Sequence, residues 1–155
     1  MPVDTGQLHR AHQEFLALAE GGGFGPPPPG EWDAGRLLAH LAAADASIAS
    51  VALAVAAGMR PGYDNRPSLD DWNLRRIADA CDGMPGLAQL LRGHGEMLCA
   101  VAARLSDADL AVRVPVLIIS RDQVVTDQPQ PLRWLIDGVA DTHLPLHAIQ
   151  LRGLR

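Results

Sequence analysis

The sequence contains no lysine, so all 13 of its basic residues are arginines. It has two cysteines, Cys81 and Cys99, and neither lies in a CxxC motif, which argues against a disulfide framework and against a thiolate metal site. The net charge is −5 and charges of both signs are scattered along the chain, which argues against nucleic-acid binding. What remains is the composition of a soluble globular protein, with 48% apolar and 20% charged residues.

The N-terminus also lacks a recognisable export signal, because its first ten residues, MPVDTGQLHR, contain no apolar run. The segment 37–57 is long enough to cross a bilayer. However, it contains His40 and Asp45 and owes much of its apolar character to alanine. An acidic side chain inside a bilayer costs a few kcal/mol on insertion scales. We therefore expect this segment to be a buried helix in a cytoplasmic protein that has no membrane or nucleic-acid partner.

Apolar residues recur at intervals of three and four along much of the chain, which predicts a single helical domain over residues 1–155. Asp4 is placed to cap a first helix, and the glycines of 21–23 are placed to end it. A second helix is expected from Asp33 to Ala57.

Two further helical stretches are predicted in the middle of the chain. Ser68 and Asp71 have the spacing of a capping box, which predicts a helix start there. The glycines and the proline of residues 82–86 interrupt this helix, and a longer one is expected through residues 87–105. Its buried face is expected to consist of Leu87, Leu90, Leu91, Met97, Leu98, Val101 and Leu105.

The stretch 112–127 breaks the helical period. It is rich in valine and isoleucine and is divided by the polar residues 121–123, which predicts a short β-hairpin or two extended arms. Pro131 then suits the first turn of a last helix. The core face of that helix is expected to carry Leu132, Leu135, Ile136, Val139, His143, Leu146 and His147. Four principal helices with a long connection before the last predict an all-α four-helix bundle with a possible short hairpin.

The last helix carries a histidine pair, His143 and His147, which lie about one turn apart on the same face. The pair alone is a weak metal motif, and it lacks the glutamate that serves as general base in HExxH. His40, inside the apolar second helix, needs a hydrogen-bond partner or a metal ion when buried. Together the three could form the nitrogen set of a catalytic zinc site, with nickel or iron as alternatives. Hydrogen-bonded core histidines are the competing interpretation.

Pro145 lies between the paired histidines. A proline inside a helix lacks the N–H that would bond the carbonyl four residues earlier, here that of Asp141, and costs about 3 kcal/mol in a plain helix. We expect a kink before Pro145 that still lets both histidines converge, with the Asp141 carbonyl free for a water or a ligand. The alternative is that the kink separates the pair and leaves a degenerate site.

The other polar and aromatic residues are assigned from their positions alone. Asp45, on the second helix, could orient a ligating histidine from the outer shell, or it could lie at a subunit or loop contact. His9 and His12 are expected at the surface or at the rim of a pocket. Trp72 and Trp134 are expected to be packing residues, and the alternative is that one of them lies near the pocket and contacts the substrate.

The second helix has the form W-x(n)-L-L-x-H-L-x(3)-D, built from Trp32, Leu37, Leu38, His40, Leu41 and Asp45. The last helix carries HxxxH followed by an apolar end, roughly a hundred residues later. In this layout, which covers most of the chain, the sequence resembles DinB-like proteins. The stretches YDNRPSLDDWN (63–73) and LSDADLAVRVPV (105–116) are similar to the mycothiol-dependent maleylpyruvate isomerase-like branch.

The resemblance implies an up-down-down-up bundle, often dimeric, with a divalent metal held by His40, His143 and His147. It also implies a low-molecular-weight-thiol (mycothiol-type) dependent S-transferase or isomerase, with the cofactor thiol held by the metal and a small molecule as substrate. Apolar surface on more than one side of the long second helix also favours a homodimer. No catalytic residue can be assigned. The alternatives are a non-catalytic bundle that binds metal or a small ligand, and a dimeric scaffold with a degenerate metal site.

Overall fold

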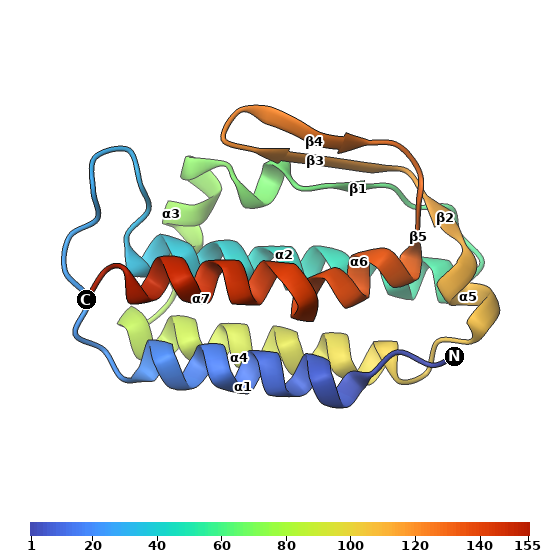
Figure 1. Ribbon diagram of the computed structural model, residues 1–155, viewed down its shortest axis with the longest axis horizontal. Helices are drawn as coiled ribbons and strands as arrows, with labels where there is room; N and C mark the ends of the chain where they lie inside the picture. The colour runs from blue at the N-terminus through green and yellow to red at the C-terminus, as the bar shows by residue number, and fades with distance from the viewer.

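The computed structural model describes all residues, 1–155, and is mostly helical with a small sheet (Figure 1). The elements in chain order are α1 (Thr5–Glu20), α2 (Ala34–Ala56), β1 (Tyr63–Asp64), η1 (Arg66–Ser68), α3 (Asp71–Ala80), α4 (Gly83–Ala102), α5 (Asp107–Ala111), β2 (Arg113–Val114), β3 (Val116–Ser120), β4 (Gln123–Asp127), β5 (Gln130–Pro131), α6 (Leu132–Gly138), η2 (Val139–His143) and α7 (Leu144–Arg152). The η1 segment is a 3₁₀ turn, and η2 is a π-helical turn.

The long helical segments lie side by side along the molecule (Figure 1). They are α1, α2, α4 and the continuous last segment made of α6, η2 and α7. In Figure 1, α2 and α4 run in one direction, and α1 and the last segment run in the other. Helix α2 contacts both α4 and the last segment, and α1 packs against α4 and α7.

Two of the observed helix starts agree with those predicted from the sequence, and a third differs. Asp4 and Asp33 cap α1 and α2, because each carboxylate accepts a backbone N–H three residues on. The predicted capping box at Ser68 is wrong: Asp70 is the N-cap of α3, and it accepts the N–H of Asn73. Ser68 is buried and lies instead in the η1 turn before that helix.

Helix α2 is long and apolar enough to cross a membrane, judged by length and composition only, and it is the one such helix in the chain. In the structure, 67% of its most apolar window is buried inside the protein. Fourteen of its 23 residues are buried, including Leu37, Leu38, Leu41, Ile48, Val51 and Val55. This is the burial expected of a core helix in a soluble protein.

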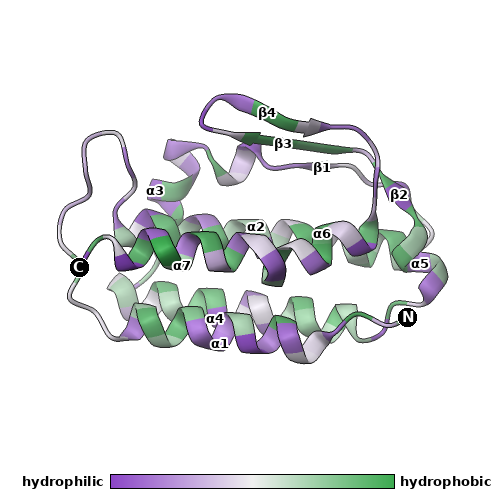
Figure 2. Ribbon diagram, in the orientation of Figure 1, coloured by the Kyte–Doolittle hydropathy of each residue, from purple (hydrophilic) through white to green (hydrophobic).

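The predicted hairpin is present. Strands β3 and β4 pair antiparallel, and both carry hydrophobic residues, green in Figure 2. Arg121 and Asp122 connect them with positive φ angles of 49° and 60°, as a two-residue turn of type I′ requires. Strand β1 adds a parallel pairing to β3, so the sheet is larger than the hairpin predicted from the sequence.

Some apolar side chains that the sequence placed in the core are exposed. Trp72 is 64% exposed, and Met97 and Trp134 are also exposed. Leu146, expected on the core face of the last helix, is 56% exposed. The reason is the π turn at Val139–His143, whose extra residue rotates the residues that follow it. As a result Leu144 and Leu151 face the core, together with His147, which was predicted there.

Candidate metal centre

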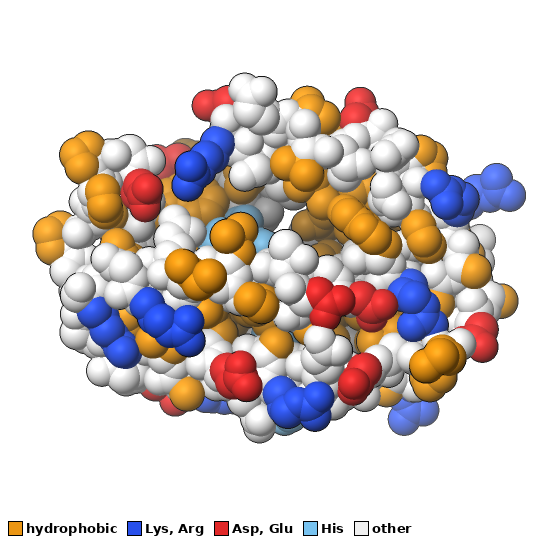
Figure 3. All heavy atoms as spheres, viewed as in Figure 1, with side chains coloured by type: hydrophobic (Ala, Val, Ile, Leu, Met, Phe, Trp, Pro, Cys, Tyr) orange, Lys and Arg blue, Asp and Glu red, His pale blue; other side chains and the backbone are white.

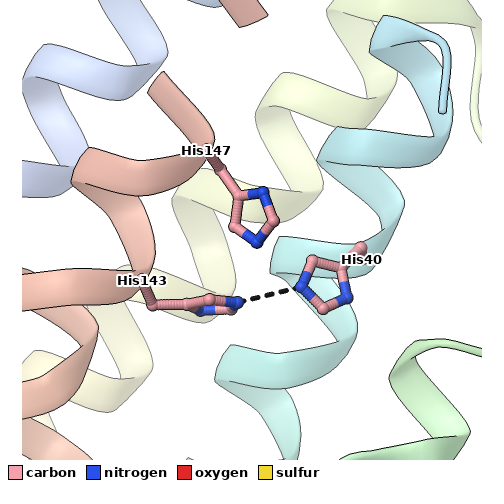
Figure 4. Close-up of side chains that lie close together, drawn as sticks. All are labelled: His40, His143 and His147. Atoms are coloured by element: carbon pink, nitrogen blue, oxygen red, sulfur yellow. Dashed lines mark hydrogen bonds between the residues drawn. The ribbon is translucent and has the colours of Figure 1, made fainter. Parts of the chain in front are cut away.

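The structure brings the three predicted histidines together. His40 comes from α2, His143 from the π turn and His147 from α7, and the three rings converge in the space between these segments (Figure 4). Their ring centroids are 4.7–5.0 Å apart. One nitrogen of each ring lies within 4.8 Å of the other two. Between the three nitrogens there is therefore a point that lies within about 2.8 Å of each of them. Small rotations of the rings would bring this distance to the 2.0–2.1 Å of a zinc–imidazole bond.

Two of the rings are oriented by hydrogen bonds at Nδ1. His40 Nδ1 is 2.6 Å from the backbone carbonyl oxygen of Ser68, and His147 Nδ1 is 2.9 Å from Gln150 Oε1. Because a carbonyl oxygen can only accept, each Nδ1 carries the proton and each Nε2 keeps its lone pair. Fixing the Nδ1–H in this way is the usual means of orienting a metal-binding histidine.

The third histidine points its Nε2 at the same place. His143 Nε2 lies 2.9 Å from His40 Nε2, the contact drawn as a dashed line in Figure 4. His40 Nε2 has no proton when its Nδ1 is bonded to Ser68, so His143 Nε2 donates in this arrangement. With a cation between the two rings, both nitrogens would present lone pairs to it instead.

All three rings favour the neutral form. Burial, together with the neighbouring His147, lowers the pKa of His40 to about 4. Burial also lowers the pKa of His143 well below its usual value, with His40 and His147 adding to the effect, and it lowers the pKa of His147. Neutral imidazoles are the form that binds metal ions, so the cluster is ready to ligate at neutral pH.

The proline between the paired histidines does not separate them. Pro145 is the second residue of α7 and directly follows the π turn, and a proline is tolerated in the first turn of a helix. The irregularity of this segment lies directly before Pro145, in the π turn, where the Leu144 N–H bonds the carbonyl of Val139. His143 and His147 keep their helical spacing across Pro145, and both face His40.

The side chains of Asp45 and Asp141 do not contact the histidine cluster. The Asp141 side chain is exposed and accepts a 2.6 Å hydrogen bond from Gln7 Nε2 on α1. Asp45 is fully buried, and its Oδ2 lies 2.7 Å from Nε2 of His12. Neither carboxylate bonds a histidine of the cluster. The prediction that Asp45 orients a ligating histidine is therefore wrong, whereas the prediction for Asp141 concerned its backbone carbonyl and stays a prediction. The orienting groups are Ser68 and Gln150.

His12 is predicted at the surface or at the rim of a pocket and is instead buried against Asp45. Its Nδ1 also donates to the Leu8 carbonyl at 2.9 Å, so both ring nitrogens have partners and the pair holds a proton between Nε2 and Oδ2. Burial raises the pKa of Asp45. Burial by itself lowers the pKa of His12, but the Asp45 carboxylate more than offsets this and the net shift is upward.

Nothing in the sequence near His12 indicates its burial, because the space for its ring comes from another helix. A Cβ added to Gly95 of α4 would lie 2.5 Å from His12 Cδ2. The absence of a side chain at Gly95 is therefore what allows the ring to enter the core. The second Asp45 oxygen, Oδ1, is buried without a hydrogen-bond partner.

The surroundings of the cluster are apolar on one side and open on another. Trp32 lies with its ring centroid 4.9 Å from that of His40. On the face shown in Figure 3, pale-blue histidine atoms are visible at the floor of a hollow. The group contains three histidines and no carboxylate or thiolate. A divalent ion bound there would keep its full charge and have positions free for exogenous ligands.

Comparison of the chain with protein-family models, with curated proteins and with solved structures finds no match.

Proposed function

We propose that this protein binds one divalent metal ion through His40, His143 and His147. The convergence of three neutral imidazoles, two of them oriented through Nδ1, carries the proposal. Zinc is the metal we put first, because three nitrogen ligands with an open position match its catalytic sites, and nickel or iron is an alternative. We further propose that the helices form the up-down-down-up, DinB-like four-helix bundle, in line with the resemblance and with the directions of the helices in Figure 1.

The activity we propose is that of a low-molecular-weight-thiol (mycothiol-type) dependent S-transferase or isomerase acting on a small molecule. A bound divalent ion would deprotonate a coordinated thiol and so supply a nucleophile. Cys99 does not fill that role, because burial raises the pKa of its thiol to about 11. Within the chain, Ser68 and Gln150 hold the ligand tautomers and Trp32 shields one side of His40 from water. We place this activity in the cytoplasm.

The test is metal analysis of protein purified without a histidine tag, followed by a thiol-conjugation assay with and without chelator. We expect about one divalent ion per chain and turnover that the chelator abolishes. Metal without thiol-dependent turnover across a panel of electrophiles would favour a non-catalytic binding bundle. Absence of metal, also after incubation with zinc, nickel and iron, would leave a scaffold with buried histidines and contradict the proposal.

We also propose a homodimer, but through a different surface from the one expected. The apolar side chains of α2 are mostly used inside the chain. The last helical segment instead exposes Trp134, Leu146 and Ile149, the last at 66%. Apolar groups of this size on one segment favour contact with a second copy. Light scattering at tens of micromolar tests this: a mass near 16.5 kDa would contradict it.

A further inference from the structure

A groove lies outside the histidine cluster, between α2 and the η1–α3 segment. Its volume is about 400 Å³, within the range of small-molecule sites. The apolar part of its lining includes Ala43, Ile77 and the exposed ring of Trp72. Its polar lining includes Ser47, Asn73 and Arg76. The groove therefore combines an aromatic wall with a small set of hydrogen-bonding groups.

Arg76 is a positively charged residue of this groove that has no ion-pair partner. Its guanidinium carbon lies 4.7 Å from the centroid of the Trp72 ring, and no carboxylate is within ion-pair distance of it. The neighbouring arginines differ: Arg36 and Arg75 both bind Asp71, at 3.0 and 2.8 Å. Stacking on Trp72 holds Arg76 in place and leaves its N–H groups available to a ligand.

The nearest acidic groups do not cancel this charge. Asp71 is occupied by Arg36 and Arg75, and Asp79, three residues after Arg76 on the same helix, forms no ion pair with it. Asn73 donates its side-chain N–H to the Pro67 carbonyl, so the amide is fixed at the groove wall. The groove therefore offers the charge of Arg76, beside the Trp72 ring, to one negatively charged group of a ligand.

We infer that this groove binds a small organic carboxylate. The carboxylate pairs with the planar fork of Arg76, and an aromatic or short hydrocarbon body lies against Trp72 and Ile77. A single arginine suits a monoanionic carboxylate better than a phosphate dianion, for which sites usually gather several donors. The inference does not rest on the metal site.

The groove and the histidine cluster share a wall. Ser68 lines the groove, and its carbonyl accepts the Nδ1–H of His40 at 2.6 Å. Ala43 and Ser47 lie one and two turns beyond His40 on α2. A carboxylate in the groove therefore sits beside the proposed metal centre without touching its ligands, as a second subsite would.

The test uses benzoate as probe and the full-length chain, with and without added zinc. Binding is followed by the indole N–H signal of Trp72 in NMR spectra, assigned with Trp72→Phe. We expect saturable binding with a dissociation constant of about 1 mM, as ligand efficiency allows for so small a molecule. Arg76→Gln should weaken it about tenfold or more, because it removes a charged hydrogen bond. Arg75→Gln, which removes an equal charge already paired with Asp71, should change it less than about twofold.

The neutral analogue benzamide and inorganic phosphate complete the experiment. Both should bind at least about tenfold more weakly than benzoate to the unmodified chain. The inference fails if benzamide binds as tightly as benzoate, if phosphate binds more tightly, if no saturation is reached, or if Arg75→Gln weakens binding as much as Arg76→Gln. Because Arg76 is exposed, its replacement leaves the folded core intact, which circular dichroism checks. The same benzoate titration in His40→Ala, which removes a proposed metal ligand, separates the two proposals: benzoate binding should persist there even if metal binding is lost.

Discussion

At the scale of single residues, the orientation of the histidines matters as much as their presence. His147 binds through Nε2 only if its proton stays on Nδ1, and Gln150 is the group that holds it there. We expect Gln150→Leu to weaken zinc binding by about 10–100-fold, the loss typical of outer-shell partners. Competition with a fluorescent chelator measures this.

Gln13 provides the matched control for that substitution. It is an exposed glutamine that contacts a histidine outside the cluster, at 3.0 Å from His9. Gln13→Leu should therefore leave zinc affinity unchanged. Equal affinity for Gln150→Leu and the unmodified protein would show that Gln150 does not orient His147.

The pKa shifts of the cluster predict how metal-free protein responds to acid. The pKa of His40 is lowered to about 4, and those of His143 and His147 are also lowered, whereas unfolded histidine titrates near 6.5. As the pH falls, the histidines of the unfolded chain therefore bind protons before those of the folded protein do. The contribution of these three histidines to the free energy of unfolding is complete above about pH 6.5 and is lost as the pH falls towards 4.

We expect the free energy of unfolding by urea to decrease between pH 7 and pH 5 in chelator-treated protein. The decrease should be smaller in His143→Gln, which lacks a histidine whose pKa burial lowers well below its usual value. The same shifts mean that protons compete with a metal only below the usual pKa of imidazole, so zinc binding should persist below pH 6.5. A pH dependence identical in both proteins would contradict this account.

At the scale of elements, the contact of α1 with α4 depends on one glycine. A methyl group at Gly95 would meet the His12 ring at 2.5 Å, and this ring is fixed by Leu8 and Asp45. We expect Gly95→Ala to destabilise the protein by about 1–3 kcal/mol, as overpacking of a core does. Thermal unfolding measures it.

Gly93, two residues earlier on α4, is the control. Nothing lies within 4 Å of a Cβ placed there, and alanine is favoured over glycine inside a helix by about 0.5–1 kcal/mol. Gly93→Ala should therefore be neutral or stabilising. If Gly95→Ala is as stable as Gly93→Ala, the His12 ring is free to move and the buried pair with Asp45 is not rigid.

The elements also show which features a sequence can predict. The histidine set could be predicted because each member lies on an apolar helix face, and the hairpin because its period differs from that of helices. The exposure of Leu146 could not be predicted, since it follows from the π turn at Val139–His143, which no local pattern indicates. The pairing of His12 with Asp45 could not be predicted either, because it depends on an approach between α1, α2 and α4.

At the scale of the whole molecule, the metal centre joins parts of the chain that are far apart. His40 and His143 are separated by 103 positions. Their segments meet only in the folded protein, so the unfolded chain does not present the three ligands together. A metal ion that binds the folded protein must therefore stabilise it against unfolding.

The final prediction measures this linkage. Zinc at about 100 times its dissociation constant adds about 2.7 kcal/mol, which in a chain of this size raises the melting temperature by roughly 5–10 °C. His40→Ala should abolish the increase, because it removes the only ligand on α2. His9→Ala, which removes an exposed histidine outside the cluster, should keep it. If His40→Ala retains the full increase in melting temperature, zinc binds somewhere other than the three histidines, and the proposed centre is wrong.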